Sequence, residues 1–96
     1  MKLRFSARAR REASRVDERW RANADYRELF VDELDALLER LRRDPSLGAP
    51  YEAPLTEPVR RARLPKTDYF VYYTVGPDEL FVVSVWSARR GRQPKL

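Results

Sequence analysis

Hydrophobic positions repeat along this chain with two different periods, and the change between them separates a helical half from a strand half. Near the N-terminus an apolar stripe follows spacings of four, three and four residues, which is the spacing of one helix face. The members of this stripe are Ala9, Ala13, Val16 and Trp20. After Val59 the apolar residues alternate with charged ones or run continuously, as they do in strands. The pattern therefore predicts helices first and a sheet afterwards.

Two helices are expected in the first half, after a short strand at residues 2–5. Ser6 is placed to cap the first helix, because a serine hydroxyl accepts hydrogen bonds from first-turn amides. Asp25 and Glu28 have the spacing of a capping box for the second helix, and Pro45 ends it, because the residue before a proline avoids the α conformation. The apolar face of the second helix consists of Tyr26, Phe30, Leu34, Leu37, Leu38 and Leu41. Its acidic face is expected to be solvated, and together the helices predict a helical hairpin.

Three β-favouring runs follow at residues 59–64, 69–75 and 80–86. In the first run Ala62 and Leu64 face one way, while Arg61 and Arg63 face the other. The other two are apolar at nearly every position, which is typical of strands buried on both sides. Residues 46–58 hold three prolines and are expected to form an ordered loop or a lid. The prediction is a single α+β domain over residues 1–96, ordered β-α-α-β-β-β, with the helical hairpin on one face of a mainly antiparallel sheet.

Composition narrows the chemistry that the chain can perform. The 96 residues include no cysteine and no histidine. A disulfide or thiolate metal site is therefore excluded, and the side chain most often used for acid–base catalysis near neutral pH is missing. The carboxylates are spread over a helix exterior, so we expect no metal and no cofactor. Neither a signal-peptide core nor a membrane span is found, so a cytoplasmic location without membrane partners is predicted.

The net charge of +5 is unevenly distributed. Two stretches, 59–66 and 86–96, carry eight basic residues and no acid: Arg60, Arg61, Arg63, Lys66, Arg89, Arg90, Arg92 and Lys95. A basic end of this kind suits a polyanion or an acidic protein segment. The alternative interpretation is that arginine is abundant throughout this chain and that these residues are solvated strand ends.

Three strings in the chain, LRFSARARREASR, VRRARLPKTDYFVYYTV and LFVVSVWSARR, resemble in this order the RelE/ParE superfamily of bacterial type II toxin–antitoxin toxins. The resemblance covers almost the whole chain. Tyr73 and Val75 match the Tyr-x-Val step of the family's aromatic strand, and residues 87–90 match the end of its last strand. The resemblance implies a toxin that inhibits growth or stabilises a plasmid and that forms a hetero-oligomer with a cognate antitoxin.

Two activities exist within this superfamily. RelE-type members are ribosome-dependent mRNA endonucleases, whereas ParE-type members inhibit DNA gyrase and cleave nothing. Arg61, Arg63 and Arg90 match basic positions of the nuclease type and are its candidate catalytic residues here. However, Phe70 occupies another basic position, and no histidine or tyrosine follows Arg90. Possible substitutes are Tyr69, Tyr72, Tyr73 and Glu57, none of which the spacing singles out. These departures favour a ParE-like toxin, which acts by binding its target. An mRNA interferase is the alternative, and a non-toxic binding module is a third hypothesis.

The predicted residues for binding the target or the antitoxin are Arg61, Arg63, Tyr73, Trp86, Arg89 and Arg90. If the first and last strands lie close together, these arginines form one basic patch; otherwise Arg61 and Arg63 are the solvated side of an amphipathic strand. The strand aromatics are interpreted as core residues rather than as a platform for stacking bases. Trp86 is either an anchor for a partner or a lid on the edge of the core.

Overall fold

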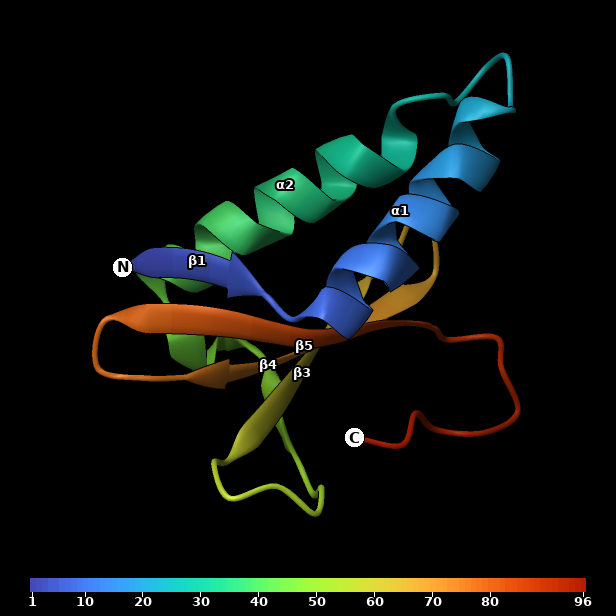
Figure 1. Cartoon of the computed structure of the whole chain (residues 1–96). Coiled ribbons are helices and arrows are strands. Elements are labelled where there is room, and N and C mark those ends of the chain that lie inside the picture. Colours follow the sequence, from blue (N-terminus) through green and yellow to red (C-terminus); the bar gives the residue numbers. More distant parts are fainter.

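The computed structural model describes residues Met1 to Leu96 and places two helices on one side of a five-stranded sheet (Figure 1). The elements, in chain order, are β1 (Lys2–Phe5), α1 (Ala7–Arg21), α2 (Leu29–Arg43), a 3₁₀ turn (Pro45–Leu47), β2 (Ala49–Tyr51), β3 (Val59–Leu64), β4 (Tyr69–Val75) and β5 (Glu79–Ser87). The predicted α+β class and the helical hairpin on one sheet face are confirmed.

The strands are arranged in the order β1-β5-β4-β3-β2. β1 pairs with β5 in parallel, and every other pair is antiparallel. The edge strand β2 lies within the segment that was expected to be a loop or a lid, so the observed order has one strand more than predicted. Its three residues include Pro50, which an edge strand tolerates because one side of its backbone has no partner. A strand this short shows no alternation that sequence could reveal.

The core lies between the helices and the sheet. Ala9 and Val16 of the predicted α1 stripe are buried, and Ala13 and Trp20 pack against the core from its margin. α2 contributes Phe30, Leu34, Leu37, Leu38 and Leu41, and the sheet contributes Ala62, Leu64, Val71, Tyr73, Leu80, Val82 and Val85. The Ser6 cap is confirmed, since its hydroxyl accepts from the Ala9 amide at 2.9 Å.

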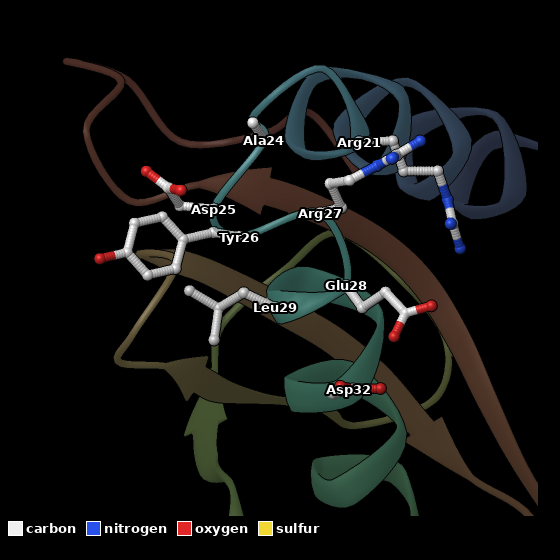
Figure 2. A pocket seen from close by; sticks show the side chains of 8 residues that line it. All are labelled: Arg21, Ala24, Asp25, Tyr26, Arg27, Glu28, Leu29 and Asp32. Atoms are coloured by element: carbon white, nitrogen blue, oxygen red, sulfur yellow. The ribbon is translucent and has the colours of Figure 1, made fainter.

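The start of α2 differs from the prediction. The helix begins at Leu29, and no side chain caps it. The Asn23 side chain instead accepts from the Asp25 amide at 3.0 Å, and this local turn competes with a capping box. Tyr26, expected on the buried face, is 56% exposed. Figure 2 shows Tyr26 and Asp25 on the segment that joins the two helices, with their side chains directed to the same side of it.

The hollow at this tip has a volume of about 580 Å³ and is open to solvent. The side chains around it carry charges of both signs: Arg21, Arg27, Asp25, Glu28 and Asp32 (Figure 2). Arg21 is already paired with Asp17 at 2.9 Å. With two basic and three acidic side chains, this hollow concentrates charge of neither sign, so the basic surface of the sheet is the stronger candidate site.

Tyr73 holds the segment after α2 against the sheet. Its ring is fully buried, its hydroxyl donates to the Pro45 carbonyl at 2.8 Å, and it accepts from the Gly48 amide at 2.9 Å. Burial raises the pKa of the Tyr73 phenol above its ordinary value, although the hydrogen bond from Gly48 acts in the opposite direction. The phenol therefore stays protonated at neutral pH and can serve as both donor and acceptor.

Glu12 joins α1 to an irregular part of the sheet. The pairing of β4 with β5 shifts its register between Tyr72 and Tyr73. Beside this shift, one Glu12 carboxylate oxygen accepts from the Ser84 hydroxyl at 2.8 Å and from the Val85 amide at 3.1 Å. The carboxylate thus satisfies polar groups of β5 next to the core.

Glu33 has a structural role on the face of α2 that was expected to be only solvated. Its carboxylate accepts from the Lys66 and Thr67 amides at 2.7 and 3.0 Å and from the Thr67 hydroxyl at 2.7 Å. These bonds fix the turn between β3 and β4 against α2.

Replacing Glu33 with alanine is expected to lower the free energy of unfolding by about 1–2 kcal/mol, because the turn loses an ionised acceptor of three hydrogen bonds. Urea denaturation measures this change. The control is Asp35→Ala in the same helix. The Asp35 carboxylate makes no hydrogen bond or ion pair, so its removal should change the free energy of unfolding by less than about 0.5 kcal/mol. Equal effects of the two substitutions would contradict the assigned role of Glu33.

Candidate binding face of the sheet

The sheet face opposite the helices gathers basic and aromatic side chains from three strands. Val71 and Tyr73 of β4 belong to the core, so Phe70 and Tyr72 between them point to the opposite side. In the register of the sheet, Phe70 lies between Arg63 and Trp86, and Tyr72 lies between Arg61 and Ser84. The name open face is used below for the surface formed by Arg61, Arg63, Phe70, Tyr72 and Trp86.

Arg61 lies among aromatic rings on the open face. Its guanidinium carbon is 4.1 Å from the ring centroid of Phe70 and 5.4 Å from that of Tyr51. The Tyr51 and Tyr72 rings meet edge to face with centroids 4.8 Å apart. Stacking of this kind holds a guanidinium by cation–π attraction while leaving its N–H groups free to bind an anion. Burial raises the pKa of the Tyr72 phenol, and the adjacent Arg61 partly offsets this shift.

Arg90 is held in a similar way at the end of β5. Its guanidinium carbon lies 3.9 Å from the centroid of Trp86. Arg61 and Arg90 both line a pocket of about 130 Å³, and the chain after β5 forms part of its lining. Its lining consists of Arg61, Phe70, Tyr72, Trp86, Ser87, Ala88, Arg90, Gly91, Arg92 and Gln93. Three of these residues are arginines and none is acidic, so the pocket has the charge and the donors to bind an anionic group.

Arg63 and Arg89 meet at a different point. Asp68, in the turn before β4, accepts from Arg63 at 2.7 Å and from Arg89 at 3.1 Å. These hydrogen bonds, the one from Arg63 first, lower the pKa of the Asp68 carboxyl below its ordinary value. Asp68 has a φ of 69°, a left-handed conformation that aspartate and asparagine tolerate better than most residues. The carboxylate therefore ties the end of β3 to the segment after β5.

This cluster predicts a pH dependence of stability. Because the folded-state pKa of Asp68 is depressed, its stabilisation is complete above the ordinary value of 3.8 and is lost as the pH falls through the lowered value. The wild type should be more stable than Asp68→Asn at about pH 6, and this difference should shrink as the pH falls below 3.8. Denaturant unfolding across this range measures the difference. Asparagine also tolerates the left-handed backbone, so a difference that stays constant with pH would contradict the ion-pair explanation.

The structure brings five of the six predicted binding residues to one end of the sheet in two groups. Arg61, Trp86 and Arg90 line the pocket on the open face, whereas Arg63 and Arg89 are joined through Asp68. Tyr73 lies apart from both groups, in the core. Sequence reasoning missed Tyr51, because it belongs to the short edge strand. It interpreted Phe70 as a missing charge and as a core aromatic, whereas Phe70 lies outside the core cluster, on the open face.

The described residues form no cluster of three or more potential metal ligands. Neither helix is long and apolar enough to cross a lipid bilayer.

Solved structures with the same fold come from toxin–antitoxin systems. The chromosomal ParDE TA system from P. aeruginosa matches at 13% identity and a TM-score of 0.62, over 93% of this chain and 97% of that chain. The YoeB dimer from Staphylococcus aureus matches at 19% identity and a TM-score of 0.65, over 90% and 94% of the two chains. The intact E. coli RelBE toxin–antitoxin complex matches at 25% identity and a TM-score of 0.61, over 93% and 98%. No curated protein sequence matches the chain.

A family model matches nearly the whole sequence. The chain belongs to the ParE toxin family, since the family model described as "ParE toxin of type II toxin-antitoxin system, parDE" matches residues 3–92. It is therefore the toxin component of a type II toxin–antitoxin system. The resemblance to the RelE/ParE superfamily expected from the strand motifs is confirmed.

Proposed function

We propose that this toxin stops growth by binding DNA gyrase in the cytoplasm through the open face, and that a cognate antitoxin neutralises it in a hetero-oligomer. The observation that carries the proposal is the match of nearly the whole chain to the ParE toxin family. Stabilisation of a plasmid that carries the toxin gene is a further expectation of this proposal.

The chemistry of the open face supports binding. The guanidiniums of Arg61 and Arg90 are each stacked on an aromatic ring, with their N–H groups available as donors. Burial raises the pKa of Tyr72, which keeps its phenol protonated. Arginine and tryptophan side chains placed together in this way resemble the residues that dominate binding energy at protein interfaces.

A supercoiling assay with purified gyrase tests the proposal. We expect the wild type to inhibit supercoiling, and Arg61→Ala and Arg90→Ala each to raise the half-inhibitory concentration by about tenfold or more. Arg11→Ala is the matched control, because it removes the same charge from an exposed position of α1 that makes no ion pair. Unchanged supercoiling at saturating wild-type protein would rule out gyrase as the target.

An mRNA interferase is the second candidate, favoured by the 25% identity to a chain of the E. coli RelBE complex and by the basic positions Arg61, Arg63 and Arg90. Sequencing of message ends on translating ribosomes distinguishes the two candidates. Codon-positioned cuts that vanish in Arg90→Ala would support the nuclease, and intact messages would count against it. Normal growth on expression without any antitoxin would support a binding module that has lost toxicity.

A further inference from the structure

A second pocket lies between α1 and the end of β5, on the side of the sheet that carries the helices. Its volume is about 220 Å³. Val16 of α1 and Val85 of β5, which line it, are core residues, and Tyr69 packs against the core beside them. The pocket of the open face shares with it only Arg90 and the last two residues of β5. It is therefore a separate site, formed mainly by α1.

Three guanidinium groups line this pocket, and none of them has an acidic partner. Arg15 and Arg19 are four residues apart on α1, so their side chains leave the same face of the helix. Arg90 reaches the pocket from the segment that follows β5. None of the three takes part in the six ion pairs of the protein. The pocket therefore concentrates positive charge between the helix and the sheet.

The single acidic residue of the lining, Glu12, is already engaged within the protein. One of its carboxylate oxygens accepts from the Ser84 hydroxyl and the Val85 amide, and the other lies 3.3 Å from the Arg8 guanidinium. Its side chain is only 12% exposed. Because Arg8 offsets the charge of Glu12, the pocket keeps a net positive charge and has donors for an anionic ligand.

The aromatic residues of the pocket are engaged as well. The Trp86 ring has the guanidinium carbons of Arg90 and Arg8 at 3.9 and 5.8 Å from its centroid. The Tyr69 ring meets Phe30 edge to face, with centroids 5.6 Å apart. Neither ring is a platform for stacking a nucleobase, so the pocket offers charge and N–H donors instead. A phosphate group, whose oxygens accept from several guanidiniums at once, is the ligand that suits this set of donors.

We propose that this pocket holds a backbone phosphate of double-stranded DNA, so that the toxin binds the DNA on which gyrase acts as well as the enzyme. The choice of DNA rests on the proposed function, because a protein bound to gyrase lies close to the DNA that gyrase supercoils. Four residues of α-helix advance by about 6 Å, so Arg15 and Arg19 can bind one phosphate or two adjacent ones. Contacts to phosphates position a protein on a duplex without reading its sequence, so binding should be independent of sequence.

The first test measures the binding of the full-length protein to a fluorescent DNA duplex, followed by anisotropy over a series of KCl concentrations. The logarithm of the binding constant falls with the logarithm of the salt concentration, with a slope of about −0.9 for each phosphate that is neutralised. We expect Arg15→Ala and Arg19→Ala each to make this slope shallower by about 1 and to weaken binding at low salt by about fivefold or more. Both side chains are exposed and alanine favours a helix, so both variants should fold.

Arg10→Ala is the matched control for these two variants. Arg10 is also an exposed arginine of α1 without an ion pair, but it lines a different hollow, beside β1. This variant should keep the slope of the wild type. An equal change of slope in all three variants would show that DNA binding follows the net charge alone and would overturn the proposal. A wild-type protein that does not bind the duplex would also overturn it.

The second test identifies the ligand by NMR of the arginine Nε–H groups. The duplex should shift the signals of Arg15 and Arg19 and leave that of Arg10 unchanged. Shifts with inorganic pyrophosphate but not with the duplex would assign the pocket to a free phosphate ligand. Larger shifts with poly-L-glutamate than with the duplex would assign it to an acidic protein segment, and either result would overturn the proposal. Because no gyrase is present, failure here is separate from failure of the supercoiling assay.

Discussion

Replacing Gly48 with alanine is expected to lower the free energy of unfolding by about 3 kcal/mol. A Cβ atom at this position would lie 2.5 Å from the Tyr73 hydroxyl oxygen and 3.0 Å from the Arg61 carbonyl oxygen. The buried phenol cannot move away without losing its bonds to the Gly48 amide and the Pro45 carbonyl. Thermal unfolding should show a decrease in Tm of about 15 °C for a domain of this size.

Gly91→Ala is the control for this substitution, because no atom lies within 4 Å of a Cβ placed there. Neither glycine has a positive φ, so both substitutions are free of backbone strain and differ only in the space available. A destabilisation by Gly48→Ala no larger than that by Gly91→Ala would show that the Tyr73 ring has room to shift. Tyr73→Phe removes the hydroxyl and should make Gly48→Ala less harmful, because the closest clash disappears.

Replacing Glu12 with alanine is the second substitution with a large expected effect, again about 3 kcal/mol in the free energy of unfolding. The Ser84 hydroxyl and the Val85 amide would lose their shared acceptor, and Ser84 is fully buried. Unpaired donors in such a place bear the full cost of their lost hydration. Denaturant unfolding measures the change, and hydrogen exchange of the Val85 amide should become faster.

The control for Glu12 is Glu18→Ala, which removes an exposed carboxylate from the same helix. We expect it to change stability by less than about 0.5 kcal/mol. Glu12→Gln keeps a side chain of the same length with one oxygen acceptor. The protein should therefore lose only part of the stability that Glu12→Ala removes. If Glu12→Gln and Glu12→Ala were equally destabilising, the effect would come from the charge beside Arg8 and not from the bonds to β5.

The parts of the fold that depend on local signals could be predicted from sequence. The spacing of Ala9, Val16 and Trp20 and the cap at Ser6 lie within one helix, and the alternation in β3 placed Arg61 opposite the core. The start of α2 could not be predicted, because the turn at Asn23 competes with the capping box for the same short segment. β2 could not be predicted either, because it exists only through its pairing with β3.

The candidate site was predictable in its residues but not in its geometry. Alternation and charge identified Arg61 and Arg90, but sequence gives no sign that each stacks on an aromatic ring. The segment after β5 is joined to the edge strand by a hydrogen bond between Tyr51 and Gln93, which no local pattern encodes. Tyr73 was predicted from a strand motif and lies in the core, where its phenol holds the backbone at Gly48.

The position of β5 between β1 and β4 has a consequence for when the chain can fold. Lys2 lies opposite Glu79, so β1, near the start of the sequence, has the much later strand β5 as its only partner. A nascent chain in which β5 has not yet left the ribosome has neither a partner for β1 nor the β5 donors that bind the Glu12 carboxylate. The sheet can therefore be completed only after β5 has emerged, and pairing across such a long separation is itself slow. An antitoxin already present can thus meet this chain before its sheet is complete.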